Sequence, residues 1–141
     1  MITDSFSAGK KPDTRAEIML YVHFPFCIKK CDYCDFLSFR YDNELVKAYL
    51  KALGSEIRGR AGSASGRSIS SVFFGGGTPS LMTGEEIRGL MELIGEHYKL
   101  ADDCEITLEA NPGTLSDDKL KMLKEAGINR LSIGLQSAND E

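Results

Sequence analysis

The sequence contains no tryptophan, no long apolar run and no surplus of basic residues. No apolar stretch approaches the ~20 residues that cross a bilayer, and residues 1–17 lack the apolar core of a signal peptide. Lys and Arg number 17 against 21 Asp and Glu, so the net charge of -4 offers no excess of cations to nucleic-acid phosphates. These absences predict a cytoplasmic protein with no membrane span and no nucleic-acid partner.

The 141 residues are 42% hydrophobic and 27% charged, which is typical of one globular domain. Residues 1–16 are polar and follow neither a helical nor a strand period, so we interpret them as a flexible lead-in. The folded region is expected to span residues 17–141.

Four β-prone runs alternate with three amphipathic segments along this region. Strands are expected at residues 18–24, 69–74, 105–109 and 131–135, helices at residues 43–60, from Thr83 and from Ser116, and a surface loop at residues 61–66. The first run is apolar throughout, which predicts a strand covered on both faces. This order predicts an α/β fold with a parallel sheet of βα units joined by right-handed helical crossovers.

Four strands are fewer than a complete fold of alternating strands and helices normally contains. A closed eight-unit barrel needs ~250 residues, and an open sheet of four strands would leave its last strand exposed. We therefore expect residues 17–141 to be the first part of a larger α/β domain. A small, complete flavodoxin-like protein is the alternative.

Three of the four cysteines, Cys27, Cys31 and Cys34, follow the first strand in a C-x-x-x-C-x-x-C spacing. In a chain without an export signal, clustered cysteines favour a metal or cluster site over disulfides. Three thiolates on one short loop can hold three corners of an iron–sulfur cluster and leave one iron open to a cofactor or substrate. A structural zinc site with His23 or Cys104 as the fourth ligand is the alternative.

Glycine-rich or polar motifs follow the other three strands. Residues 75–78 (Gly-Gly-Gly-Thr) follow the second strand, Glu109 to Asn111 the third, and Gln136 and Ser137 the fourth. A glycine backbone can approach a ligand closely and offer exposed N–H groups to a carboxylate, whereas Glu109 suits an ammonium or a ribose hydroxyl. Taken singly, a glycine run is a tight turn. Together these motifs lie at the carboxyl edge of a parallel sheet, where such folds build their sites.

The motifs at residues 21–34, 74–80, 109–112 and 129–137 resemble those of radical S-adenosylmethionine (SAM) proteins of the oxygen-independent coproporphyrinogen oxidase group. The resemblance implies that residues 17–141 form the N-terminal part of a radical SAM core domain, with the first four strands of a partial (β/α)6-type barrel.

Within that group, Cys34-Asp35-Phe36 together with Ser38 is similar to the haem chaperone branch. The oxidase branch carries a further cysteine two positions after the third cluster ligand, and this sequence has Phe36 there. The resemblance therefore favours the haem chaperone branch.

The same resemblance implies the cofactors and their contacts. Cys27, Cys31 and Cys34 would hold a 4Fe–4S cluster, and SAM would chelate the iron that they leave open. The residues implied to contact SAM are Tyr21, Tyr33 (near the adenine), Gly76, Gly77, Thr78, Glu109 and Gln136. No residue of this chain is assigned a catalytic role.

Three functions are considered. The first is a haem chaperone that carries the cluster and SAM, with haem or a porphyrinogen, an electron donor and a haem-acceptor protein as partners. The alternative is an oxygen-independent coproporphyrinogen III oxidase, in which a radical formed from SAM starts the decarboxylation of porphyrinogen propionates. A zinc-binding module is the third. Because such a radical must be kept from water, we expect this part of the domain alone to be inactive as an enzyme.

The sequence offers few candidates for a haem ligand. His23 and His97 are its two histidines, and each is interpreted as structural or solvated. Cys104, far from the other cysteines, is interpreted as a small buried residue that contributes to packing.

Overall fold

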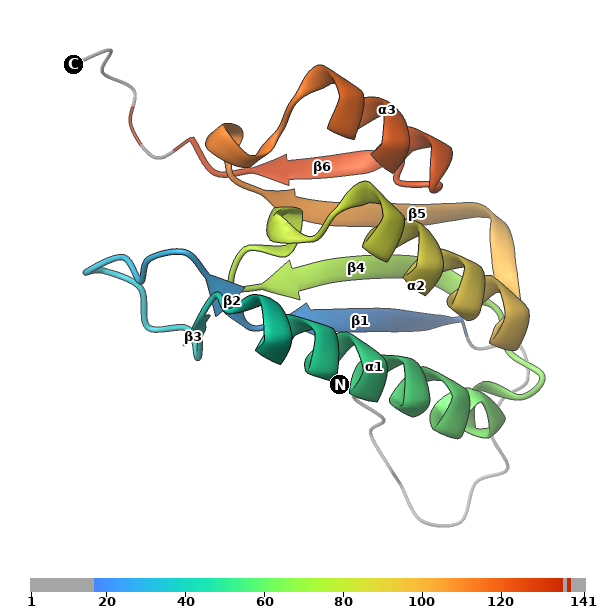
Figure 1. Cartoon of the computed structure of the whole chain (residues 1–141). Helices are drawn as coiled ribbons and strands as arrows, with labels where there is room; N and C mark the ends of the chain where they lie inside the picture. Colours follow the sequence, from blue (N-terminus) through green and yellow to red (C-terminus); the bar gives the residue numbers. More distant parts are fainter. Residues whose placement is uncertain (1–16, 136, 138–141) are drawn as a thin grey trace.

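Four parallel strands form the main sheet of the computed structural model, which describes residues 17–135 and 137 (Figure 1). The strands are β1 Ile18–Phe24, β4 Ile69–Gly76, β5 Leu100–Ala110 and β6 Arg130–Ile133. They lie in the order β1-β4-β5-β6, and each neighbouring pair is parallel. The predicted α/β fold with a parallel sheet of βα units is therefore confirmed.

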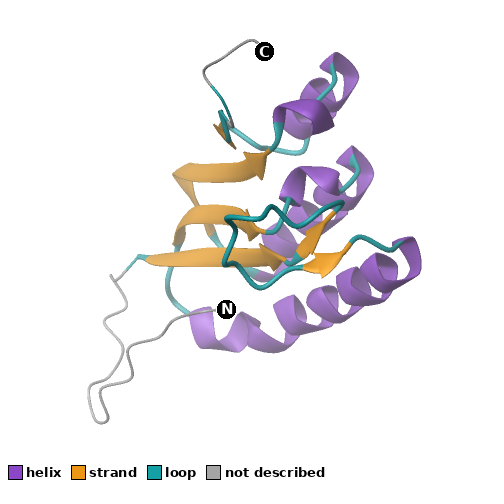
Figure 2. Ribbon diagram, turned by 90° about the vertical axis from the view of Figure 1, so that its left-hand side faces the viewer, coloured by secondary structure: helices purple, strands orange, loops and turns teal. Residues whose placement is uncertain are grey.

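Three helices connect these strands, and all three lie on one face of the sheet (Figures 1 and 2). They are α1 Asn43–Arg60, α2 Gly84–His97 and α3 Asp117–Glu125, with the short 3-10 helices η1 Ala61–Ala64, η2 Pro79–Leu81 and η3 Pro112–Thr114. Because the strand order advances in one direction, each right-handed crossover places its helix on the same side. In a flavodoxin-like sheet the strand order changes direction within the sheet. The order β1-β4-β5-β6 does not, so the flavodoxin-like alternative is wrong for the described residues. None of the described helices is long and apolar enough to cross a membrane.

The core lies between the sheet and the three helices. Val22, Phe74 and Leu108 pair across three neighbouring strands, and each side chain is at most 2% exposed. Ile87 and Ile94 of α2 belong to the same buried cluster and are fully buried. The removal of this apolar surface from water is the main favourable contribution to the stability of the fold.

The opposite side of the sheet, which we call the open face, has no helix over it in the part of the chain that the structure describes (Figure 2). Met19 is 69% exposed and Tyr21 is 37% exposed, although both lie in the apolar run of β1. In the part of the chain that the structure describes, this strand is therefore covered on one face and not, as predicted, on both. Strand alternation places His23 on the open face beside Tyr21, and the Tyr21 ring stacks on Phe73 of β4 with 6.0 Å between ring centroids.

Several element boundaries differ from those predicted. β5 begins at Leu100 rather than at Glu105. Its pairing with β4 continues on both sides of a shift in register, since Leu100 pairs with Ile69 and Glu105 pairs with Ser71. β6 ends at Ile133 rather than at Leu135, because its partner β5 ends opposite Ile133. The segment 61–66, expected to be a loop, begins with the short helix η1.

The N-terminus of α2 is closed by a capping box at Thr83, the residue at which the sequence predicts that this helix begins. Thr83 Oγ1 accepts a hydrogen bond from the Glu86 backbone N–H at 3.2 Å, and the Thr83 N–H donates to Glu86 Oε2 at 2.7 Å. We expect Thr83→Ala to lower the free energy of unfolding by about 1 kcal/mol, because the Glu86 N–H loses its cap. Thr83→Ser keeps the hydroxyl and should match the parent in urea unfolding followed by circular dichroism. An equal loss in both variants would contradict the capping role.

Candidate functional site

The three clustered cysteines lie on a loop whose base is held by backbone hydrogen bonds. A short parallel pair, β2 Phe26–Cys27 and β3 Phe39–Arg40, joins the two ends of this cysteine loop (residues 27–39). The Phe39 N–H donates to Pro25 O at 2.7 Å. Neither strand was predicted, because two residues carry no readable period. Figure 1 places the loop at the edge where the arrows of the main sheet end.

The cysteines of this loop differ in exposure, and none is in a disulfide. Cys27 and Cys34 are half-buried, whereas Cys31 is exposed. The Cys34 N–H donates to Cys31 O at 3.0 Å, which turns the chain between these two residues. The Tyr33 phenol hydrogen-bonds to Cys31, and this contact is the main cause of the raised pKa of Tyr33. Tyr33 therefore lies directly beside a candidate ligand.

The glycine loop (residues 75–78) packs on the start of the cysteine loop. The Thr78 N–H donates to Phe26 O at 2.9 Å, and Thr78 Oγ1 donates to Cys27 Sγ at 3.5 Å. A Cβ at position 77 would lie 2.9 Å from Cys27 Sγ and 2.7 Å from Phe26 O. Only a residue without a side chain allows the two loops to approach this closely.

Glu109, near the end of β5, contacts the glycine loop from the other side. Its Oε2 accepts a hydrogen bond from the Gly76 N–H at 3.1 Å. Gly76 has a φ of +123°, which favours glycine, and a Cβ there would lie 2.8 Å from His23 Nδ1. Tyr21 Oη lies 3.2 Å from the same nitrogen. Burial raises the pKa of Tyr21, and the negative charge of Glu109 raises it further.

The backbone N–H groups of the glycine loop have partners within the protein. The Gly77 N–H donates to Phe24 O at 2.8 Å, and those of Gly76 and Thr78 donate as described above. These three N–H groups are therefore not exposed as expected, and the carboxylate that the Gly76 N–H holds is that of Glu109. What the loop contributes is a surface without side chains, over which a ligand can approach the backbone.

One depression at the carboxyl edge of the sheet brings these parts together. Its lining includes the three clustered cysteines, Tyr33, and residues 76–79, 109–111 and 132–134. Lys29 and Lys30 line it as well; sequence reasoning missed them, although their place between the first two cysteines was a signal. Tyr21 is outside this lining and lies beside Glu109 on the open face. Gln136, the remaining implied SAM contact, lies outside the described residues.

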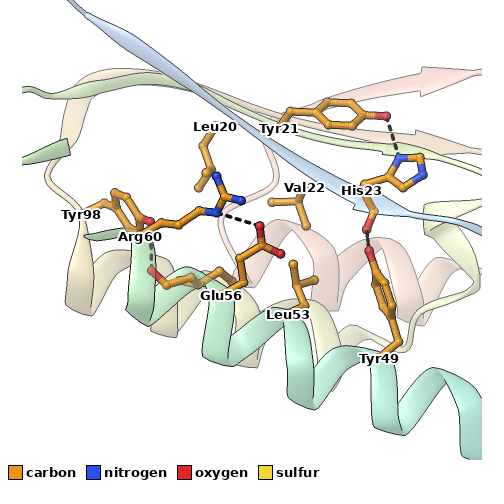
Figure 3. A pocket seen from close by; sticks show the side chains of 10 residues that line it. Leu20, Tyr21, Val22, His23, Tyr49, Leu53, Glu56, Arg60 and Tyr98 are labelled. Carbon is orange, nitrogen blue, oxygen red and sulfur yellow. Dashed lines mark hydrogen bonds and ion pairs between the residues drawn. The ribbon is translucent and has the colours of Figure 1, made fainter. Parts of the chain in front are cut away.

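A second hollow lies between β1 and α1 (Figure 3). Tyr49 Oη donates to the His23 carbonyl at 2.6 Å, and an ion pair joins Arg60 to Glu56 at 2.8 Å. Figure 3 shows the side chains of Tyr21 and His23 on the side of β1 away from α1. We assign this hollow to the packing of α1 against the outer edge of the sheet, separate from the depression that holds the cysteines.

The chemistry of the three thiols fits an iron–sulfur cluster, because thiolates are the usual ligands of its irons. Structural zinc needs its ligands within ~2.3 Å of one point, and among residues 17–135 and 137 no three Cys, His, Asp or Glu side chains are grouped to hold one ion. Cys104 is buried and directly precedes Glu105, which pairs with Ser71 of β4. Ser71 lies about 16 Å from the carboxyl end of β4, at ~3.3 Å per residue. Cys104 is therefore too far from the cysteine loop to be a fourth ligand. Each iron of a four-iron cluster binds its own thiolate, which suits three cysteines spread around one depression.

A parallel sheet wound in one direction, with three free cysteines on a loop at its carboxyl edge, is typical of α/β proteins of the barrel type. The family model of the radical SAM superfamily matches residues 21–141, and the chain belongs to this superfamily. Membership implies a 4Fe–4S cluster and SAM as cofactors.

The proteins similar to this chain include a heme chaperone and a coproporphyrinogen III oxidase. The chain is 41% identical over 125 residues to heme chaperone HemW of Escherichia coli (strain K12), covering 88% of this chain and 33% of that protein. It is 41% identical over 121 residues to the mitochondrial radical S-adenosyl methionine domain-containing protein 1 of Bos taurus, covering 86% and 27%. The solved structure of coproporphyrinogen III oxidase (HemN) from Escherichia coli, a radical SAM enzyme, matches with a TM-score of 0.84 and 37% identity, covering 89% and 29%. The chain thus spans about a third of the length of these relatives.

Proposed function

We propose that this chain forms the part of a haem chaperone that binds the 4Fe–4S cluster and SAM. The observation that carries the proposal is the single depression lined by three free thiols, the glycine loop and Glu109. The 41% identity to HemW supports the haem chaperone branch. So does Phe36, which occupies the position where the oxidase branch has a further cysteine.

Each part of the depression has its own task in this proposal. Cys27, Cys31 and Cys34 hold three irons, and the Thr78 hydroxyl, at 3.5 Å from Cys27 Sγ, orients the first thiolate. The cluster that these cysteines would hold would supply one electron for the reduction of SAM. Glu109 keeps one carboxylate oxygen on the Gly76 N–H and offers the other to the ammonium or a ribose hydroxyl.

Haem or a porphyrinogen, an electron donor and a haem-acceptor protein are the partners that this function requires. Neither histidine of the chain is assigned to haem. His23 Nδ1 is hydrogen-bonded to Tyr21, and burial lowers the pKa of His23. His97 ends α2 and is half-buried at the edge of the sheet opposite the cysteine loop. The cytoplasmic location expected from the lack of an export signal stays a prediction.

Anaerobic reconstitution with iron and sulfide, followed by EPR of the reduced protein, tests the proposal. We expect about four irons per chain and a signal that changes when SAM is added. Cys27→Ser should lose the cluster, whereas Cys104→Ser should keep it, because Cys104 is buried in the core away from the cysteine loop. Zinc in place of iron, or cluster loss in Cys104→Ser, would show that the assignment of the thiols is wrong.

An oxygen-independent coproporphyrinogen III oxidase is the second candidate, because the HemN structure shares this fold with a TM-score of 0.84. Two assays of the cluster-loaded protein separate the candidates. Haem binding, seen as a shifted absorption band, would favour the chaperone. Release of carbon dioxide from the porphyrinogen would favour the oxidase.

A further inference from the structure

Ser80 joins the loop that follows β4 to the loop that follows β5. Its side chain is fully buried, with 0% exposure, within η2. Ser80 Oγ accepts a hydrogen bond from the Asn111 N–H at 3.2 Å and lies 2.5 Å from Thr114 Oγ1. Thr114 Oγ1 donates to Asn111 O at 2.7 Å. Because the Thr114 proton is used there, the Ser80 hydroxyl is the donor between the two hydroxyls, and both protons have a partner.

A third element holds Ser80 through its backbone. Lys119, in the first turn of α3, donates a hydrogen bond from Nζ to the Ser80 carbonyl oxygen. Burial lowers the pKa of this lysine, which is half-buried. Ser80 is therefore fixed at both its side chain and its carbonyl, which leaves η2 little freedom to move.

The linkage that Ser80 forms with Asn111 and Thr114 lies next to the candidate site. The ladder between β4 and β5 ends where Phe74 pairs with Leu108, so the glycine loop and Glu109 lie beyond it. There, two side-chain contacts tie the strand ends together: the one between Gly76 and Glu109, and the one between Ser80 and Asn111. The first involves groups that the proposed function needs for SAM. The second is formed by the fully buried Ser80 hydroxyl and includes none of the groups implied to contact SAM.

We propose that Ser80 is a positioning residue for SAM, whose hydroxyl, shared with Thr114, holds Glu109 and Asn111 at a fixed spacing from the glycine loop. The proposal rests on the proposed function, since it gives the linkage a purpose only if SAM binds at this edge of the sheet. Residues that orient ligand-binding groups from behind typically change affinity by ~10- to 100-fold when replaced, without contacting the ligand.

Affinity for SAM, measured by the EPR change of the reconstituted chain, is the first test. Ser80→Ala and Thr114→Val each break the linkage, and we expect about tenfold weaker SAM binding with unchanged iron content. Thr114→Ser keeps the hydroxyl and should restore the parent affinity. Thr107→Val is the matched control, because Thr107 is also fully buried and hydrogen-bonded, but to Glu105 and Arg130 away from the glycine loop.

Amide hydrogen exchange of the cluster-free chain is the second test, and it needs no cofactor. Loss of the Ser80 acceptor should speed exchange of the Asn111 amide by about tenfold, and exchange at Gly76 should rise with it, because both ties hold the same strand ends. Thr107→Val should leave both rates unchanged.

The two tests distinguish failure of the inference from failure of the proposed function. Unchanged SAM affinity in both Ser80→Ala and Thr114→Val would overturn the positioning role, as would an equal loss in Thr107→Val. A parent chain that assembles no cluster and binds no SAM would refute the proposed function and the assignment to SAM with it. The exchange rates would then show only whether Ser80 ties the two loops together.

Discussion

Gly77→Ala is expected to reduce assembly of the cluster by about 10- to 100-fold, although it removes no ligand. A Cβ at position 77 would lie 2.9 Å from Cys27 Sγ and 2.7 Å from Phe26 O. The Phe26 carbonyl accepts the Thr78 N–H and belongs to the pair that forms the base of the cysteine loop, so it has no room to retreat. The thiol of Cys27 must then leave its place beside Thr78. Iron and sulfide content after anaerobic reconstitution measures the loss.

Gly113→Ala is the matched control for this prediction. Gly113 lies in η3, next to the same edge of the sheet, and a Cβ there would meet no heavy atom within 4 Å. It should therefore assemble as much cluster as the parent. Circular dichroism of Gly77→Ala should show that the fold persists, which separates a displaced ligand from an unfolded chain. The steric account is wrong if the folded Gly77→Ala chain takes up iron as fully as Gly113→Ala does.

The helices, and the alternation of strands and helices along the chain, could be predicted because their signals are local. The helix at residues 43–60 is found with those bounds, since its apolar spacing is regular and Asp42 caps its first turn through the Leu45 N–H. The helix expected from Ser116 is found as α3, which ends just before Gly127, a residue with a φ of +97° that favours glycine. The start of β5 was missed, since Asp102 and Asp103 look like a loop in the sequence although they extend the strand.

The open face could not be predicted from the apolar run of β1. Periodicity reports that Ile18 to Phe24 are apolar, whereas the number of layers that cover the strand depends on the direction in which later strands are added. Tyr21 is exposed at 37% for this reason, and its ring lies against Phe73 and near His23 rather than in a two-sided core.

The sequence predicted which residues belong to the candidate site, but not how these residues contact one another. Spacing identified the cysteines, and the common edge of a parallel sheet brought the glycine loop and Glu109 to them. No pattern revealed that the glycine N–H groups donate within the protein, or that Ser80 and Thr114 share a hydrogen bond. Such pairings join residues more than thirty positions apart and depend on the relative placement of two loops, which a single sequence does not encode locally.

Glu109→Gln is expected to weaken SAM binding by about 10- to 150-fold, because hydrogen bonds to a charged group contribute ~1.5–3 kcal/mol. The amide keeps the size of the side chain and can still accept from the Gly76 N–H, so the loops should stay in place. What it loses is the negative charge that attracts the ammonium of SAM at the lining of the depression. Iron content should therefore equal that of the parent, and the EPR signal should change only at higher SAM concentration.

Glu105→Gln provides the control on the same strand and the same face. Glu105 lies four residues before Glu109 and pairs with Arg130 at 3.3 Å, outside the lining of the depression. It is half-exposed, so loss of this ion pair should alter stability little, and SAM affinity should not change. If both variants weakened binding equally, the effect would come from the net charge of the open face rather than from a contact at Glu109. A selective loss in Glu109→Gln, with the cluster intact, would assign the carboxylate at the end of β5 to SAM and separate its role from that of the thiols.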